Sequence, residues 1–182
     1  MKTAIKNNEA NLLFDITIPD SENTFILATP TDGNQTINEQ SGIWFVDSDL
    51  TKKGLNLQEL ANTPFKYEAR IINIENNVNL SLGRFSDPET SDDSQIFSQA
   101  LEGFKFPGED LLRNLPEELE PPINLANGQY KVIISLEPNT DDTDITGSDI
   151  FLPILETEIP EDLEPYENYP LKLTYAPIKL NI

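Results

Sequence analysis

Histidine and cysteine are both missing from this chain of 182 residues. Imidazole is the side chain whose unperturbed pKa lies near neutrality, and thiolate is the usual sulfur nucleophile and soft metal ligand. Their absence therefore excludes disulfides, thiol redox chemistry, histidine-based triads and the usual zinc sites. The chain also has only 8 glycines, and neither a phosphate-binding glycine loop nor a serine-nucleophile motif is present. We predict that the protein is not an enzyme.

Long hydrophobic runs are missing as well. The longest uninterrupted ones are four residues, at 25–28 and 43–46, whereas a bilayer-spanning helix needs about 20 apolar residues. Lys2 and Lys6 would suit the start of a signal peptide, but the polar residues 7–11 follow where its apolar region should be. These features predict a soluble, cytoplasmic protein without a signal peptide.

Positive charge is scarce and unevenly distributed. Lys and Arg number 12 against 32 Asp and Glu, so the net charge is −20. Residues 86–168 hold 21 acidic and 3 basic side chains, and 3 − 21 gives −18; the remaining residues hold 9 basic and 11 acidic, and 9 − 11 gives −2. Nucleic acids and anionic lipids are polyanions that proteins bind through Lys and Arg. We therefore expect neither a direct nucleic-acid partner nor a membrane partner.

Alternating apolar and polar residues predict several short strands separated by turn residues. The clearest alternation runs from Phe65 to Ile71, and its expected hairpin partner is 78–82. A first hairpin is expected from 14–18 and 24–29, which flank turn-forming residues. The full set of expected strands is 14–18, 24–29, 42–47, 65–71, 78–82, 130–136, 151–155 and a bent terminal strand over 171–182. Pro153 interrupts the segment 151–155, which is therefore expected to be an edge strand or an extended loop.

Residues 84–127 have a different pattern and are expected to form an acidic helical and loop insertion. Helical spacing of apolar residues, with Asp92 as the N-cap and Gly103 at the end, predicts a helix over 92–103. A second short helix is expected over 108–114. The whole chain, 1–182, is thus predicted to be one mainly β domain, an antiparallel β-sandwich with a short helical insertion. The alternative is an α+β domain whose insertion covers one sheet face.

One six-residue pattern occurs twice. Residues 116–121 read Pro-Glu-Glu-Leu-Glu-Pro and residues 160–165 read Pro-Glu-Asp-Leu-Glu-Pro. Proline followed by acidic residues favours the start of a helical turn, so both copies are candidates for single turns that lead into a strand. Chance similarity in a chain rich in Pro and Glu is nevertheless the favoured explanation, because true repeats extend over 20 to 50 residues, and no function follows from the pattern.

Clustered carboxylates also raise a calcium-dependent alternative. Residues 142–147 place oxygen-bearing side chains at positions one, three and five of a loop and glycine at six, as an EF-hand does. An EF-hand needs a bidentate Glu at position twelve, where this chain has Pro153, so the segment is not an EF-hand. A looser calcium site would use Asp141, Asp142, Asp144 and Asp149. No other cofactor is expected.

The segregated charge and the missing catalytic groups together favour a non-catalytic interaction or assembly module. Its acidic surface would bind a basic partner protein, with an attraction that salt weakens. The expected partner-binding residues are Asp87, Glu89, Asp92, Asp93, Glu117, Glu118, Glu120, Asp141, Asp142 and Asp144.

Other functions stay open on the sequence alone. A nucleic-acid-mimicking inhibitor would present carboxylates in place of the phosphate array. The calcium-dependent binding module would use Asp142, Asp144 and Asp149. A hydrolase based on paired carboxylates is the catalytic alternative, although 32 acidic residues make such pairs inevitable and therefore uninformative. Acidic loops that serve solubility alone are the non-functional explanation.

Overall fold

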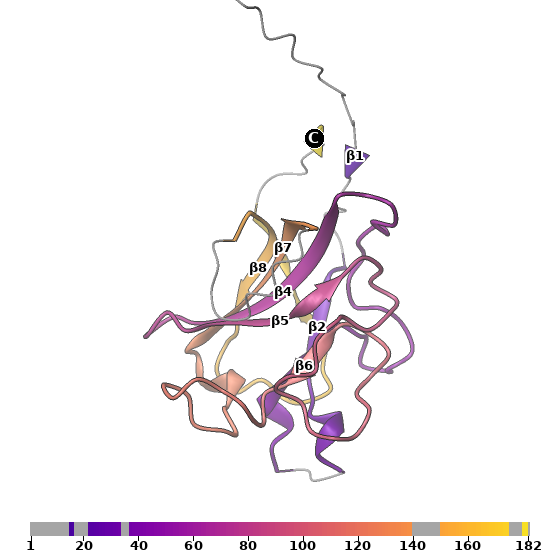
Figure 1. The fold of residues 1–182 in the computed structure, drawn as a ribbon. Helices are drawn as coiled ribbons and strands as arrows, with labels where there is room; N and C mark the ends of the chain where they lie inside the picture. Colours follow the sequence, from indigo (N-terminus) through magenta and orange to yellow (C-terminus); the bar gives the residue numbers. More distant parts are fainter. Residues whose placement is uncertain (1–14, 17–21, 34–36, 140–149, 175–179, 182) are drawn as a thin grey trace, which may run out of the picture.

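Two antiparallel sheets face each other across a common core, as in a β-sandwich (Figure 1). The computed structural model describes residues 15–16, 22–33, 37–139, 150–174 and 180–181. The predicted mainly β, antiparallel architecture is confirmed. No helix in the described residues is long and apolar enough to span a membrane.

The five-stranded sheet has the order β10-β8-β7-β4-β5 and the four-stranded sheet the order β6-β3-β2-β9. Strands of the first are β4 (Phe65–Asn73), β5 (Asn79–Phe85), β7 (Tyr130–Pro138), β8 (Leu152–Glu158) and β10 (Lys172–Leu173). Strands of the second are β2 (Thr24–Leu27), β3 (Gly42–Trp44), β6 (Gly108–Asp110) and β9 (Tyr169–Pro170). The remaining elements are the paired strands β1 (Asp15–Ile16) and β11 (Leu180–Asn181) and the 3-10 helices η1 (Pro30–Asp32), η2 (Glu39–Ser41) and η3 (Leu125–Asn127).

The hairpin predicted from the alternation at 65–71 is present in the structure. β4 pairs with β5 in antiparallel register, with a bulge between Ala69 and Arg70. The residues on one face of β4, including Tyr67, Ala69 and Ile71, are buried in the central core. The same core contains Phe25 from the opposite sheet, so the period-two pattern correctly identified the inward face.

The predicted amino-terminal hairpin is wrong. β1 pairs with β11 rather than with β2, and β2 lies between β3 and β9. Phe25, Ile26 and Leu27 are all fully buried, so both faces of β2 are covered. The neighbours of β2 are therefore set by packing against its two faces, and not by the turn residues that precede it.

The helix predicted over residues 92–103 does not form. Backbone N–H groups of Phe97 and Ser98 instead donate to Oε1 of Glu109, at 2.6 and 3.2 Å. A helix would direct these groups to carbonyls four residues earlier. Because a buried carboxylate binds them, these two N–H groups keep hydrogen-bond partners although the segment is not helical.

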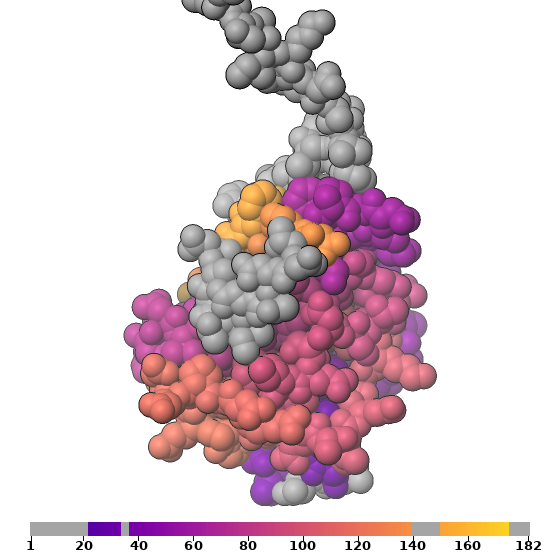
Figure 2. Space-filling model, in the orientation of Figure 1, coloured from indigo at the N-terminus to yellow at the C-terminus, as the bar shows by residue number. Residues whose placement is uncertain are grey.

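Residues 84–127 are all described, and η3 is their only helix. The second predicted helix, over 108–114, is wrong: β6 begins there and pairs with β3 at the sheet edge. Figure 2 shows that the pink and salmon surface of this segment covers much of one face of the molecule. The insertion is thus mainly irregular loops packed on the sandwich, and it also supplies the edge strand β6 and the short helix η3.

The carboxy-terminal predictions are confirmed in part. The strand expected at 151–155 is β8, which lies between β7 and β10 rather than at a free edge. Pro153 is tolerated because the β7–β8 register shifts between Ile134 and Ser135 at this point. The single bent strand expected over 171–182 is instead two strands, β10 and β11, which belong to different sheets.

A buried ion-pair cluster lies on the other face of β4. Nη2 of Arg70 is 2.7 Å from Oε1 of Glu68, and Nε of Arg84 is 2.9 Å from Oε2 of the same carboxylate. Ser81 Oγ donates a further hydrogen bond of 2.6 Å to Oε1. The Glu68 and Arg70 side chains are each 1% exposed, so their charges are compensated by ion pairs within the protein rather than by water.

Candidate functional site

The carboxylates of residues 87–93 serve local structure and ion pairs. Glu89 pairs with Lys53 at 3.1 Å and Asp93 with Lys66 at 3.3 Å, while Asp87 accepts the N–H of Glu89. Both lysines come from the part of the sequence that is nearly neutral. Lysines from the nearly neutral part of the sequence therefore lie next to carboxylates of the acidic part. Their positive charges weaken the acidic field that the sequence predicted at residues 87–93.

Asp92, another predicted partner-binding residue, is turned into the protein. The carboxylate accepts the N–H of Ser94 at 2.9 Å and that of Gly108 at 2.8 Å. It lies so close to Gly83 that a Cβ built there would be 2.5 Å from Oδ1 of Asp92. Burial raises the pKa of Asp92 to about 7. This carboxylate supports the insertion and is not presented to a partner.

Two further carboxylates, unforeseen from the sequence, are fully buried on β6. Glu109 binds the N–H groups of the irregular segment, and Asp110 accepts hydrogen bonds from the Thr31 N–H at 2.8 Å and from Nε1 of Trp44 at 2.8 Å. Burial raises the pKa of Glu109 to about 8 and that of Asp110 to about 6. In an acid-rich segment, nothing in the sequence distinguishes such structural carboxylates from solvated ones.

The repeated hexapeptides form two acidic turns, which we define as residues 116–121 and 160–165. In the first, the Leu119 N–H donates to the Pro116 carbonyl at 2.9 Å. Leu119 and Leu163, the matching leucines, are 7% and 8% exposed and belong to the same core. Each leucine anchors its turn, and the acidic residues around it point away from the core. Each copy contains a turn, at 117–118 and at 161–162, but neither is the helical turn that the sequence predicted.

Three exposed acidic residues lie on each acidic turn. No described residue forms an ion pair with any of them. The set comprises Glu117, Glu118 and Glu120, which the sequence predicted as partner-binding residues, and Glu161, Asp162 and Glu164, which it did not. The repeat itself was the signal that could have found the second three.

The acidic turns lie at neighbouring places on the protein. The Asp162 N–H donates to the Ala126 carbonyl at 3.0 Å, and the Glu161 side chain lies over Gly128, where a Cβ would be 2.8 Å from Glu161 Cγ. The residues that follow the first turn and the last residue of the second line one groove of about 310 Å³. We call it the turn groove; its lining is Ile37, Asn38, Glu39, Gln40, Ser41, Pro122, Ile123, Asn124 and Pro165.

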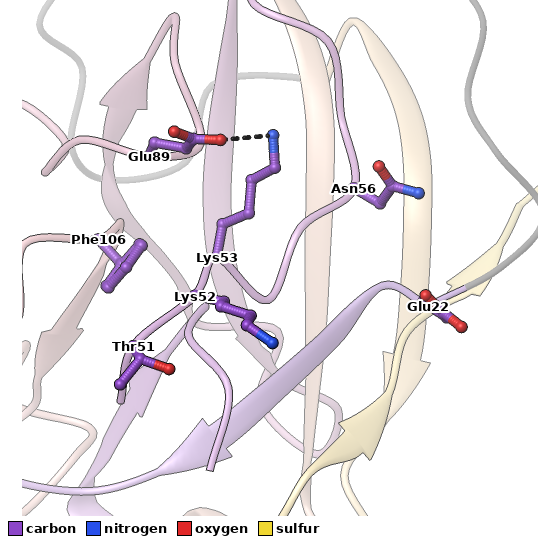
Figure 3. Close-up of a pocket in the computed structure, with 7 residues that line it drawn as sticks. All are labelled: Glu22, Thr51, Lys52, Lys53, Asn56, Glu89 and Phe106. Atoms are coloured by element: carbon purple, nitrogen blue, oxygen red, sulfur yellow. Dashed lines mark ion pairs between the residues drawn. The ribbon is translucent and has the colours of Figure 1, made fainter. Parts of the chain in front are cut away.

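A second, larger cleft of about 530 Å³ contains two lysines (Figure 3). The ammonium group of Lys53 points toward Glu89, its ion-pair partner, whereas Lys52 forms no ion pair with a described residue. The other lining residues are Glu22, Thr51, Asn56 and Phe106. Two glutamates balance the two lysines, so the lining has no net charge with which to attract an anion.

The remaining predicted site residues, Asp141, Asp142, Asp144 and Asp149, lie outside the described residues. Among the residues that are described, no group of three or more His, Cys, Asp or Glu side chains is arranged to hold a metal ion. The acidic turns and the turn groove are therefore the candidate functional site. Comparisons with protein-family models, with curated proteins and with solved structures found no match for this chain.

Proposed function

We propose that this protein is a non-catalytic interaction module whose acidic turns bind a basic surface of a partner protein. The main support is the group of exposed carboxylates, three on each turn, that pair with no described residue. Residues 111–170 contain only two cations, Arg113 and Lys131, and Lys131 pairs with Glu156 at 3.0 Å. Within this stretch of sequence the turn carboxylates therefore have few cations to pair with, whereas Glu89 and Asp93 pair with Lys53 and Lys66.

The anchored turns suit this role because they present their charges on a fixed backbone. A buried leucine in each turn limits its movement, so little ordering is needed when a partner binds. The field would speed the encounter with a cationic protein and lose strength with added salt. We infer a protein partner rather than a nucleic acid or an anionic membrane, since a net charge of −20 repels both.

The test compares proteins that co-purify at low salt with three forms of the chain. One form is unchanged, and the second has all six turn carboxylates converted to amides. The third is a charge-matched control with exposed acids neutralised elsewhere, namely Glu22, Asp49, Glu59, Glu75, Glu102 and Glu158. Mass spectrometry should find a basic partner with the first and third forms only. Retention of that partner by the second form, or at about 0.5 M salt, would contradict the proposal.

A further inference from the structure

We propose that the turn groove binds an aliphatic side chain of an extended, lysine- or arginine-rich segment of the partner. This inference rests on the proposed function and specifies the partner chemistry at the same site. It comes from a juxtaposition: residues that closely follow the acids of both turns, Pro122 and Pro165, contribute to the apolar lining of one groove.

The apolar wall comes from separate parts of the chain. Ile37 is 79% exposed, the highest value among the large hydrophobic side chains in the described residues. Pro122, Ile123 and Pro165 supply the rest of the apolar lining. A groove of about 310 Å³ is near the lower end of the range for ligand pockets, so it suits one or two side chains rather than a folded surface.

The polar lining suits a peptide backbone. The Asn38 side chain lines the groove and forms no hydrogen bond with a described residue, and an amide of this kind can both donate to and accept from a main chain. Gln40, in contrast, is held in place, because its Nε2 donates to the Leu163 carbonyl at 2.8 Å. This bond ties one wall of the groove to the leucine of the second acidic turn.

The acidic residues near the turn groove indicate a cationic occupant. Pro121 and Pro122 follow Glu120, and Pro165 follows Glu164, so each acidic turn leads directly into the groove lining. Glu39 adds a carboxylate to the wall, although its Oε2 already accepts from the Thr29 N–H and the Tyr166 hydroxyl at 3.0 Å. An occupant with cations before and after an aliphatic side chain would complement acids that belong to both turns.

The experiment uses short fluorescent peptides and the full chain. The first peptide has lysines on both sides of one central leucine, the second replaces the leucine with glycine, and the third keeps the leucine but replaces the lysines with serines. Fluorescence anisotropy at low salt should show the first peptide binding about tenfold more tightly than the second. The third should show no measurable binding.

Substitution of Ile37 locates the bound leucine. Ile37→Ser should remove the difference between the first two peptides and leave the affinity for the second unchanged. Ile74→Ser is the matched control, because Ile74 is also exposed, at 43%, but lies at the β4–β5 turn. It should change neither affinity.

The outcomes separate the two proposals. If the first two peptides bind equally, and Ile37→Ser has no effect, the groove inference is wrong while the acidic turns remain a binding surface for cations. If neither lysine peptide binds, both proposals fail. Equal binding of the first and third peptides would show an apolar site that does not need the acidic turns, and would overturn the partner chemistry proposed here.

Discussion

The indole Nε1 of Trp44 donates a hydrogen bond of 2.8 Å to Oδ1 of Asp110 beneath the irregular segment of the insertion. Trp44 is 4% exposed and meets Phe104 edge to face, with ring centroids 5.2 Å apart. Gly103 lies against the indole so closely that a Cβ there would be 2.1 Å from Trp44 Cη2. The single tryptophan of the chain therefore connects the four-stranded sheet to the segment that covers it.

Asp110→Ala should lower the free energy of unfolding by about 2–4 kcal/mol. The substitution leaves the Trp44 Nε1–H and the Thr31 N–H without their acceptor in a buried site, and each unsatisfied group costs about 1–3 kcal/mol. Urea unfolding followed by Trp44 emission would measure the change. Asp49→Ala, at an exposed aspartate, is the control and should change stability by less than about 0.5 kcal/mol. Equal effects of both substitutions would contradict the buried role of Asp110.

Stability should decrease as the pH rises from about 5 to about 8. Burial raises the pKa of Asp92 to about 7, that of Glu109 to about 8 and that of Asp110 to about 6. The folded state therefore binds more protons than the unfolded state between the ordinary carboxyl pKa and these values, and this stabilisation is lost as the groups ionise. Urea unfolding across this pH range would measure the slope.

Glu109→Gln tests the contribution of one group to that slope. The amide oxygen can still accept from Phe97 and Ser98, and the amide nitrogen can donate to Ser94 Oγ, so the variant imitates protonated Glu109. It should reduce the pH dependence by at most about 1.4 kcal/mol per pH unit, the value for one proton. Glu102→Gln removes one exposed charge from the same segment and is the control. An unchanged slope in Glu109→Gln would rule out Glu109 as a source.

Glu68→Gln should lower the free energy of unfolding by about 3 kcal/mol, because Arg70 and Arg84 share this buried carboxylate. Glu156→Gln is the matched control. Glu156 forms an ion pair with a single cation, Lys131, in the same five-stranded sheet, but its side chain is 36% exposed. Its expected effect is below about 1 kcal/mol. Chemical unfolding of both variants at one pH would compare them, and similar losses would refute the difference attributed to burial.

Local sequence patterns predicted the strands correctly where burial of one strand face determines how the strand is placed. The alternation on β4 led to the correct hairpin, and the alternation on β7 identified its inward face. Local patterns failed where the neighbouring strand comes from far along the chain, as with β2 and β9. They also failed where a side chain, such as that of Glu109, accepts the backbone hydrogen bonds that a helix would have formed. A spacing of apolar residues cannot show that a distant carboxylate will bind the N–H groups of the same segment.

The acidic surface was predictable only in part, for a related reason. Sequence charge counts could not show that Lys53 and Lys66 reach Glu89 and Asp93. They did identify Glu117 and its neighbours, which the structure leaves exposed. The second acidic turn was visible only as a repeat, and core anchoring by Leu163 gives that repeat its structural meaning.

Strand pairing in the four-stranded sheet has a consequence for synthesis of the chain. β2, near the amino terminus, needs β9 as a neighbour, and β9 includes Tyr169. Chain segments with such distant contacts close slowly, whereas the β4–β5 hairpin closes locally. A ribosome-bound chain would therefore hold β2 without its β9 neighbour until residues 169–170 had left the exit tunnel, long after the segments of the β4–β5 hairpin had emerged and could pair.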